Sequence, residues 1–332
     1  MTDIPLKNTK FSVLDLAPVI EGGTPGDSFR NTIDLAKHVE EWGFTRYWMA
    51  EHHNMPFIAS SATSIAISHV LHHTSTIRVG SGGVMLPNHA PLIVAEQFGT
   101  LETLFPDRVD LGLGRAPGTD QLTAQALRRN GNSNPDDFPE QLDELRGYFT
   151  GDSRIRAIPG EGLNVPIWLL GSSGFSAQLA GQLGLPFSFA SHFSPNNTHG
   201  ALRLYRQSFQ PSETLDEPYV MVGVNVIAAD TDEEAQRLAT SLQQQFLNLV
   251  RNTNKLLQPP VDDMDEIWTT QEEAALQQQL GASIIGSADT VREKLEKFQM
   301  DTQADEMMVI SQIYDHDARL RSYEIVADIM NK

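Results

Sequence analysis

The sequence predicts an α/β protein that folds as a single-domain (β/α)8 TIM barrel. Short strand-like runs alternate with longer amphipathic segments eight times along the chain, as expected for parallel strands joined by helices. Glycine, serine and charged residues recur where these runs end, and in a barrel those ends share the ligand-binding face. A doubly wound sheet has the same alternation, but eight regular repeats and a closing helix favour the barrel. A length of 332 residues fits one such domain.

The strands are expected where β-branched, aromatic and long aliphatic residues form short runs. In chain order they are Phe11–Leu16, Arg46–Glu51, Ile77–Met85, Arg108–Gly114, Pro166–Gly171, Pro186–Ser191, Pro218–Ala229 and Glu306–Ser311. The expected helices are Phe29–Trp42, Ser61–His73, Ala90–Leu104, Asp120–Arg128, Phe175–Gly184, Asn197–Phe209, Asp232–Arg251 and Asp317–Met330. Capping residues and acids at Asp230–Glu234 suit a helix start, and Ser287 is expected to begin a cap before Val291–Phe298.

Two stretches interrupt this rhythm and are expected to be insertions into the barrel. Asn130–Leu163 follows the fourth strand and is rich in Gly, Asn, Pro and charge. Asn252–Ile285 follows the seventh strand and mixes prolines, acids and glutamines. Neither has enough apolar residues for a core of its own, so neither is expected to form a separate domain.

Composition excludes several kinds of function. The chain carries 24 basic and 43 acidic residues, a formal net charge of −19, which argues against nucleic acid as a partner. The absence of cysteine excludes disulfides, thiolate metal sites and cysteine nucleophiles. Met1–Lys10 lacks a signal-peptide core, and the longest apolar run, Tyr219–Ala229, is too short to cross a bilayer. We therefore expect a cytoplasmic protein with no membrane partner.

The most informative stretch is Arg46–Asn54, where an apolar strand stops at Glu51, His52 and His53. Buried carboxylates and imidazoles are costly unless they are paired or functional, so this is either a satisfied polar cluster or a reaction centre. Side chains alternate along a strand, so these two histidines do not easily reach one ion and no metal is expected. A second histidine group has helical spacing at a helix end and is interpreted as structural: His69, His72 and His73.

Two glycine pairs stand in or after strand-like runs. Gly82-Gly83 weakens its strand, so it forms either a simple bulge or a place where a flat aromatic ring approaches the backbone. Gly112-x-Gly114 does not continue into a dinucleotide-binding fingerprint, because the next glycine, Gly118, has the wrong spacing. A Rossmann site is therefore rejected.

Two further strand ends could bind an anion. Arg115 follows the fourth strand among glycines and forms either a surface ion pair or part of an anion site. Ser172, Ser173 and Ser176 surround a glycine where the fifth strand turns into a helix. A single serine would suffice for an ordinary N-cap, whereas three hydroxyls beside a helix start favour a phosphate.

These strand ends carry a resemblance to a known family. The chain is similar to the bacterial luciferase-like, flavin-dependent monooxygenases from roughly Phe11 to Ala327. The motifs that carry the resemblance are Ala50-Glu-His-His-Asn54, Val79-Gly-Ser-Gly-Gly-Val-Met-Leu86, Pro106-Asp-Arg-Val-Asp-Leu-Gly-Leu-Gly-Arg115, Gly171-Ser-Ser-Gly-Phe-Ser-Ala-Gln178 and Tyr314-Asp-His-Asp-Ala-Arg319. Each motif alone is weak evidence, but together they are highly specific.

The resemblance implies an FMN site and assigns roles by residue matching. His52 matches the family's reactive-site histidine, and a non-prolyl cis peptide is expected at Gly82–Gly83, under the isoalloxazine ring. The cofactor-binding positions are Glu51, Gly82, Gly83, Arg115, Ser172, Ser173 and Ser176, of which the last four match phosphate-binding positions. The residues expected around the substrate are His53, Phe57, Met85, His192 and Phe193.

The resemblance also implies a reaction and its partners. Reduced FMN, supplied by a separate reductase, would react with O2 to a C4a-peroxyflavin that oxidises a small, apolar organic substrate, with His52 transferring a proton. An F420-dependent hydride-transfer enzyme and a non-catalytic flavin-binding protein are alternatives, and a metallohydrolase is a more distant one. A homodimer is expected through the small residues of Ser60–Ser68. Gly114 replaces a luciferase cysteine, so light emission is not implied, and Asn252–Ile285 has no recognisable match to the luciferase lid.

Overall fold

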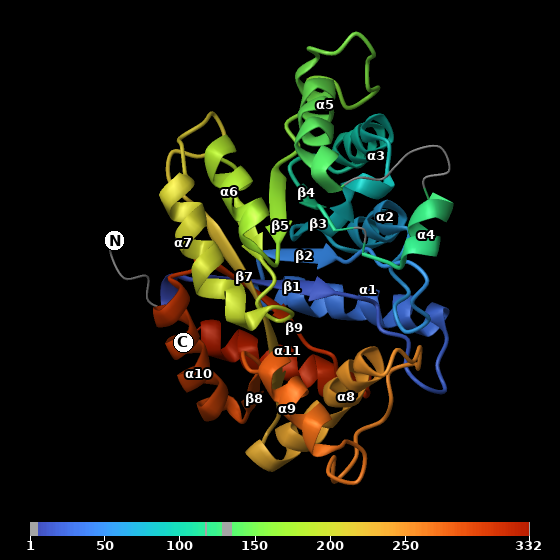
Figure 1. Cartoon of the computed structure of the whole chain (residues 1–332), viewed down its shortest axis with the longest axis vertical. Helices are drawn as coiled ribbons and strands as arrows, with labels where there is room; N and C mark the ends of the chain where they lie inside the picture. Colours follow the sequence, from blue (N-terminus) through green and yellow to red (C-terminus); the bar gives the residue numbers. More distant parts are fainter. Residues whose placement is uncertain (1–5, 117, 128–134, 332) are drawn as a thin grey trace.

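Eight parallel strands close into a barrel in the computed structural model, which describes residues 6–116, 118–127 and 135–331 (Figure 1). The barrel strands are β1 (Lys10–Asp15), β2 (Arg46–Met49), β3 (Arg78–Met85), β4 (Val109–Gly114), β5 (Ile167–Gly171), β6 (Phe187–Phe189), β7 (Val220–Ala228) and β9 (Glu306–Ile310). Each pairs with the next in parallel, and β9 lies between β7 and β1. The predicted (β/α)8 barrel is confirmed.

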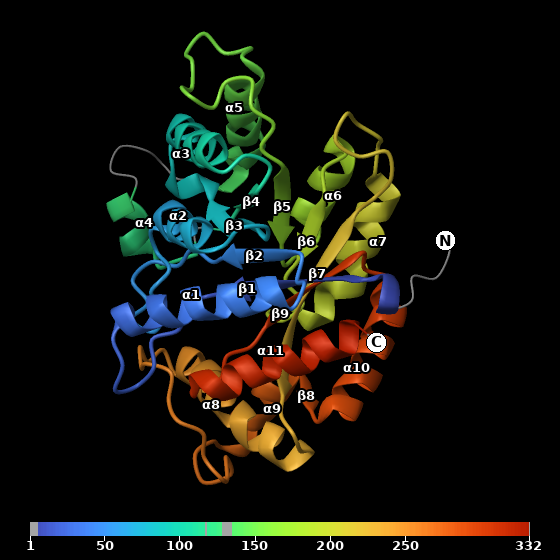
Figure 2. The same cartoon turned by 180° about the vertical axis from the view of Figure 1, so that it is seen from behind.

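Helices wrap around the outside of the strands (Figure 2). They are α1 (Pro25–Glu41), α2 (Thr63–His73), α3 (Pro91–Leu104), α4 (Gln121–Leu127), α5 (Phe138–Thr150), α6 (Gly174–Leu183), α7 (Thr198–Ser208), α8 (Asp232–Val250), α9 (Thr270–Gln279), α10 (Ala288–Thr302) and α11 (His316–Met330). Single 3-10 turns add η1 (Leu6–Asn8), η2 (Leu86–Asn88), η3 (Pro135–Asp137) and η4 (Pro195–Asn197). All eight expected helices are present, although the expected end of the fourth, Arg128, lies outside the described residues.

The two expected caps differ. Thr231 caps α8 as predicted, because its hydroxyl accepts a hydrogen bond from the Glu234 N–H. Ser287 stands at the N-cap position of α10 as predicted, but its side chain makes no capping bond with the described residues. The Asp232 carboxylate instead accepts from the Ser287 N–H at 2.6 Å, which ties the start of α10 to the start of α8.

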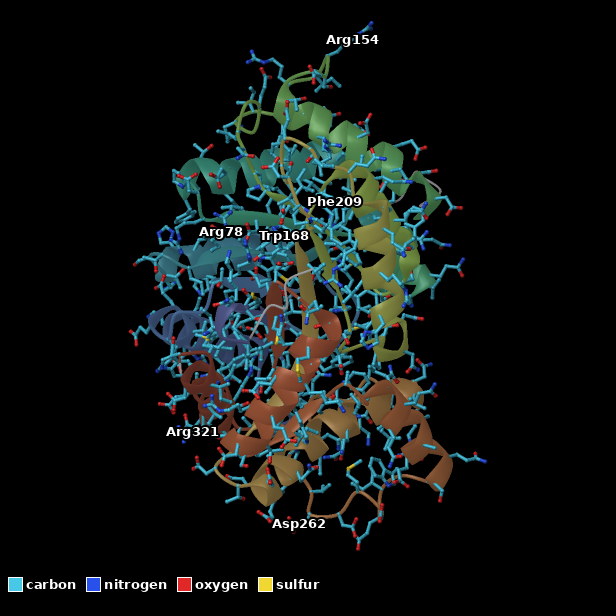
Figure 3. All side chains as sticks on the ribbon, turned by 90° about the vertical axis from the view of Figure 1, so that its left-hand side faces the viewer. Arg78, Arg154, Trp168, Phe209, Asp262 and Arg321 are labelled. Atoms are coloured by element: carbon cyan, nitrogen blue, oxygen red, sulfur yellow. The ribbon has the colours of Figure 1, made fainter. Side chains whose placement is uncertain are left out.

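Both insertions contain regular structure that depends on the barrel. In the first, α5 was not expected, yet it packs on α3 and buries Phe138, Leu142 and Leu145 in the main core. In the second, α9 and the short strand β8 (Ile284–Gly286) join an apolar cluster with α8, and β8 pairs with the end of β7. Arg154 of the first insertion and Asp262 of the second lie at opposite ends of the molecule (Figure 3). The second insertion contacts the loop after β1, where the Glu21 N–H donates to the Leu257 carbonyl.

The barrel interior is filled by side chains, so a ligand has to bind at one of its ends. An apolar cluster of Leu14, Trp48, Trp168, Met221 and Met308 fills the centre, with the two indole rings edge to face at 5.3 Å. Parallel barrels bind ligands at the C-terminal ends of their strands. Within the described part of the chain, every helix is too short or too polar to span a bilayer.

The N-terminal ends of the strands carry a buried network of charges. Arg46 donates to Asp110 at 2.7 Å and to Glu306 at 3.0 Å, and Arg78 donates to Asp110 at 2.7 Å. The Tyr219 hydroxyl donates to the second oxygen of Glu306 at 2.8 Å. Each carboxylate therefore has partners on both oxygens, as buried charges require.

Candidate active site

The polar clusters found in the sequence share one rim of the barrel. They follow β2, β3, β4, β5, β6 and β9, and the strands of a parallel barrel all end on the same face. Neighbouring groups are in contact there. The His52 ring bonds with the Gly118 backbone, and His52 lies close enough to His192 for their charges to interact.

Glu51 is the centre of a satisfied polar cluster. Its Oε1 accepts from Nε2 of His53 and from Nε2 of His89, both at 2.9 Å, and its Oε2 accepts from the Met85 N–H at 3.2 Å. Burial by itself raises the pKa of Glu51, but the hydrogen bonds from the two imidazoles outweigh it and lower that pKa to about 2. Glu51 is therefore a fixed carboxylate that joins the end of β2 to the loop after β3.

His89 was missed in the sequence. It stands four residues after Met85, close to a motif that carries the family resemblance, and this proximity was the available signal. Among the described residues, Glu51, His53 and His89 have ligand atoms within 4.8 Å of one another, a spacing that could hold a metal ion. The bonds between them already satisfy this carboxylate.

Both oxygens of Glu51 have hydrogen-bond partners, whereas His52 and His192 each have a ring nitrogen without one among the described residues. Nδ1 of both rings is buried and has no hydrogen-bond partner among the residues that the structure describes. Burial lowers the pKa of His52, while the bond with the Gly118 backbone and the charge of Glu51 act in the opposite direction. Burial, with the nearby His52 adding to it, lowers the pKa of His192 to about 4. Both imidazoles are therefore neutral near pH 7, with a nitrogen left for a ligand.

Arg115 lies against the start of α6. Its guanidinium carbon is 4.2 Å from the ring centre of Phe175, in the first turn of that helix. Among the described residues, the expected surface ion pair is a long contact of 3.9 Å between Arg115 and Asp136, whose side chain is itself exposed. The Arg115 side chain is 32% exposed. Its charge is therefore accessible to a ligand at the mouth of the barrel, the face formed by the C-terminal ends of the strands.

The serines around this turn do not form an ordinary cap. Ser173 occupies the N-cap position of α6, but its side chain makes no capping bond with any described residue. Ser172 and Ser173 are exposed, whereas Ser176 is buried and packs against Gly171. Beside Arg115, the first N–H groups of α6 are thus not capped by Ser173 in the part of the chain that the structure describes, a combination that suits a phosphate.

The peptide bond between Gly82 and Gly83 is cis, as predicted. The register of β3 on β4 shifts at this point, which is the bulge considered from the sequence. A Cβ atom at Gly82 would lie 2.6 Å from Leu14 Cδ1, and one at Gly83 would lie 2.6 Å from the Gly112 carbonyl oxygen. The backbone contact therefore requires glycine at position 83, whereas a side chain at position 82 would displace the end of Leu14.

The residues expected around the substrate lie in different settings. His53 is bonded to Glu51, and the Met85 sulfur packs against Gly114, where a Cβ atom would lie 2.7 Å away. Phe57 is buried beside a small cavity near the end of β1, and Phe193 is half exposed after β6. The group formed by His69, His72 and His73 was interpreted as structural. The structure agrees for His73, whose Nδ1 bonds to the His69 carbonyl of the same helix at 2.8 Å.

A closed parallel barrel whose ligand-binding mouth carries unpaired polar atoms is the architecture of a (β/α)8 enzyme. The family is shown by comparison: residues 9–303 match the model of the luciferase-like monooxygenases, and the chain belongs to that family. It is therefore an oxidoreductase, and the resemblance found in the sequence is confirmed.

Several curated relatives extend over nearly the whole chain. YvbT of Bacillus subtilis (strain 168) is 62% identical and covers 99% of both chains. A luciferase-like monooxygenase of Escherichia coli (strain K12) is 51% identical over 99% of this chain and 98% of the relative. An N-acetyl-S-alkylcysteine monooxygenase of Bacillus subtilis (strain 168) is 31% identical over 96% of this chain and 97% of the relative.

Solved structures share the fold. Apo-MsnO8 is 36% identical, with a TM-score of 0.87 over 97% of this chain and 98% of its own. Two more distant barrels show the same fold at 17% and 16% identity, with TM-scores of 0.73 and 0.70. The first is an oxygenating constituent of 3,6-diketocamphane monooxygenase in complex with FMN, and the second is an F420-dependent secondary alcohol dehydrogenase.

Proposed function

We propose that this oxidoreductase is a monooxygenase that uses reduced FMN and O2 to oxidise a small organic molecule. The observation that carries the proposal is the position of Arg115 beside the uncapped start of α6, on the same mouth as the unpaired nitrogens of His52 and His192. The N-acetyl-S-alkylcysteine monooxygenase, which is similar to this chain over 96% of its residues, supports the same reaction class. Bound reduced FMN would supply the electrons that activate O2.

The donor set near α6 fits the phosphate of FMN. Arg115 would pair with the phosphate, and the exposed hydroxyls of Ser172 and Ser173 would donate to it together with the first N–H groups of α6. Ser176, which is buried in the same turn and packs against Gly171, is proposed as the third serine of this phosphate site. Gly82 and Gly83 would lie under the ring, on the strand next to β4.

His52 is proposed as the proton-transfer group. Its lowered pKa leaves the imidazole neutral near pH 7, so the unpaired Nδ1 can accept a proton or a hydrogen bond from a reacting group. His192 faces the same region and adds a second neutral acceptor. Glu51 would act indirectly, by holding His53, His89 and the Met85 backbone in place.

The cofactor can be identified by direct titration. The apoprotein is titrated with FMN, FAD and F420, and each complex is then reduced and mixed with O2 while oxygen consumption is followed. We expect FMN to bind most tightly and its reduced complex to consume O2. Preference for F420, whose reduced form does not react in this way, would establish the hydride-transfer alternative. Binding of FMN without oxidation of any supplied substrate would favour a non-catalytic flavin-binding protein.

A separate flavin reductase and a homodimer complete the proposal. The outer face of α2 and α3 carries a groove of about 550 Å³, lined by Ile65, His69, Gln97 and Leu104 among others. Ile65 is 71% exposed, an unusual position for a large apolar side chain. A second copy packed on this face would cover it, so Ile65→Glu should shift the mass measured by light scattering from dimer to monomer. A wild-type mass equal to one chain would reject the dimer.

A further inference from the structure

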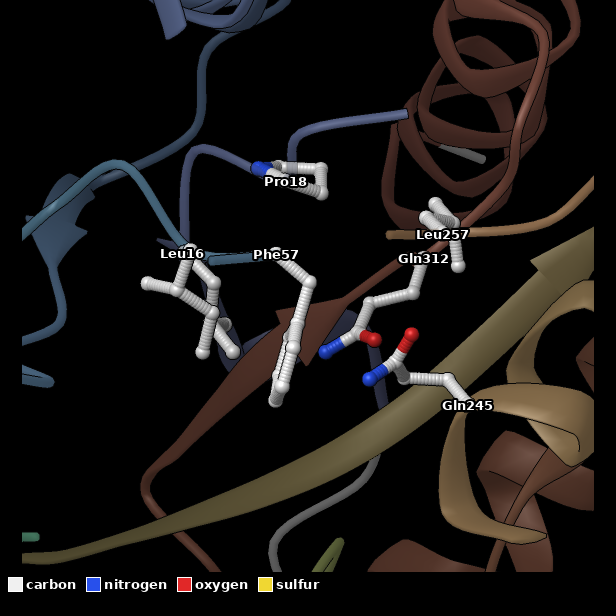
Figure 4. A pocket seen from close by; sticks show the side chains of 7 residues that line it. Leu16, Pro18, Phe57, Gln245, Leu257 and Gln312 are labelled. Carbon is white, nitrogen blue, oxygen red and sulfur yellow. The ribbon is translucent and has the colours of Figure 1, made fainter. Parts of the chain in front are cut away.

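A small cavity lies at the C-terminal ends of β1 and β9 (Figure 4). Its volume is about 10 Å³, and it is lined by Leu16, Pro18, Phe57, Ile58, Gln245, Leu257 and Gln312. In the order of the barrel strands, β1 and β9 lie across from β4 and β5, which carry Arg115 and the serine turn. The cavity is therefore on the side of the mouth away from the proposed phosphate site.

Gln245 is unusual among the residues around this cavity. Its side chain is only 4% exposed, yet neither its Nε2 nor its Oε1 has a hydrogen-bond partner in the described part of the chain. The amides of Gln245 and Gln312 point toward one another beside the ring of Phe57 (Figure 4). Buried amides in native proteins are nearly always paired, so an unpaired one needs an explanation.

The neighbouring residue shows that the helix itself does not prevent pairing. Gln244 is also buried in α8, at 5% exposure, and its Nε2 donates to the Pro259 carbonyl at 2.9 Å. Asn248, one turn further along, donates to the Gln258 side chain at 3.0 Å. These two amides hold the second insertion against α8, whereas Gln245 lines the cavity.

The rim around the cavity is held rigidly. The guanidinium of Arg319 donates to Asp15 at 2.8 Å and to the Ser311 carbonyl at 2.9 Å, so it joins the ends of β1 and β9. Leu16 follows β1 directly, and Gln312 is the second residue after β9. Leu16 also packs on the apolar cluster that contains Leu14, the residue nearest to Gly82. The cavity is thus connected through packed side chains to the strand proposed to lie under the flavin.

A primary amide offers one acceptor and two donors, so the group that satisfies it best presents a donor and an acceptor side by side. The cavity, at about 10 Å³, has room for about one polar atom of such a group, while Phe57 and Leu16 supply apolar surface next to it. We infer that Gln245 and Gln312 recognise an amide group on an otherwise apolar substrate. This inference rests on the proposed function, because the ligand is the molecule oxidised at the same mouth.

The test compares two probes that differ only in the hydrogen-bonding group, N-hexylacetamide and 2-nonanone. Binding to the protein loaded with oxidised FMN is measured by calorimetry without O2 or reductant. We expect the acetamide to bind about tenfold more tightly, as one or two added hydrogen bonds imply. Gln245→Leu should remove most of this preference, because the acetamide then loses a donor and an acceptor, whereas the ketone loses only a donor to its carbonyl oxygen. Gln244→Leu, the matched control, should keep the preference, although it loses a paired amide.

Equal binding of both probes by the wild-type protein would overturn the inference, as would an unchanged preference in Gln245→Leu. Either result would mean that the amide holds only an ordered water, for which the cavity is large enough. The wild-type comparison decides the question even if the variant does not fold. The binding test involves no turnover, so its result is independent of the proposed oxygenation. The protein could oxygenate a substrate and show no amide preference, or show the preference and oxygenate nothing.

Discussion

The two ends of the barrel use buried polar groups in opposite ways. At the N-terminal end, Arg46, Asp110 and Glu306 are each bonded to one another or to a neighbour. At the C-terminal end, His52 Nδ1 and His192 Nδ1 are equally buried, but no described residue pairs with them. The C-terminal end also has satisfied groups, such as Glu51 and the pair Asp15–Arg319, but it differs in leaving the two imidazole nitrogens for a ligand. Substitutions at the two ends should therefore have different effects: on stability at the N-terminal end, and on turnover and cofactor binding at the C-terminal end.

The largest loss of stability is expected at the N-terminal end. Arg46→Met would leave Glu306 with an uncompensated buried charge and would take one of its two arginines from Asp110, so the free energy of unfolding should fall by about 3–5 kcal/mol. Urea unfolding measures this change. Arg321→Met is the matched control, because Arg321 pairs with Asp230 on the surface and its loss should cost less than about 1 kcal/mol. Equal losses in the two variants would contradict this difference between the ends.

At the C-terminal end, the largest effect is expected on turnover. His52→Ala should lower the rate of substrate oxidation by about 10²–10⁴-fold, the range for loss of a proton-transfer group. FMN affinity should change little, and the free energy of unfolding should fall by only about 1 kcal/mol, because the ring loses its bond with the Gly118 backbone while Nδ1 has no described partner to lose. Steady-state kinetics and urea unfolding together check this outcome. Unchanged turnover would remove His52 from the mechanism.

A smaller effect is expected on cofactor affinity. Arg115→Ala should weaken FMN binding by about 10–100-fold, since it removes a charge-assisted contact with the phosphate. Riboflavin, which has no phosphate, should bind both forms equally, and fluorescence titration measures all four affinities. Arg154→Ala, at an exposed arginine far out on the first insertion, is the control (Figure 3). Equal FMN affinity in wild type and Arg115→Ala would place the phosphate elsewhere.

The smallest effect is expected in the pH dependence of stability. The folded-state pKa of Glu51 is lowered from 4.5 to about 2, so its contribution is complete above pH 4.5 and is lost as the pH falls toward 2. The difference in unfolding free energy between wild type and Glu51→Gln should therefore shrink as the pH falls through this window. A difference independent of pH would show that Glu51 is not held as a carboxylate.

Much of the fold could be predicted because strand ends are marked locally. The apolar run that stops at Glu51 and the glycines after β4 are visible in the sequence without knowledge of their neighbours. Helix α5 was missed, since the Gly, Asn and Pro content of its surroundings obscured the apolar face formed by Phe138, Leu142 and Leu145. The cis peptide came from the family resemblance and not from the residues alone.

The site was harder to predict because its partners are distant in sequence. Glu51 bonds to His89, 38 positions away, and Arg319 bonds to Asp15 across 304 positions. No local pattern tells whether the nitrogen of a buried imidazole is paired, as for His52, or which of two adjacent glutamines lacks a partner, as for Gln244 and Gln245. These distinctions require the positions of all neighbours.

The central claim is that the C-terminal mouth, and not the paired end, holds the flavin. A crystal structure of the protein with FMN tests it most directly. We predict the phosphate within hydrogen-bond distance of Arg115 and of the first N–H groups of α6, with the ring over Gly82–Gly83. A phosphate bound away from Arg115, or a ring bound outside the mouth, would contradict the account.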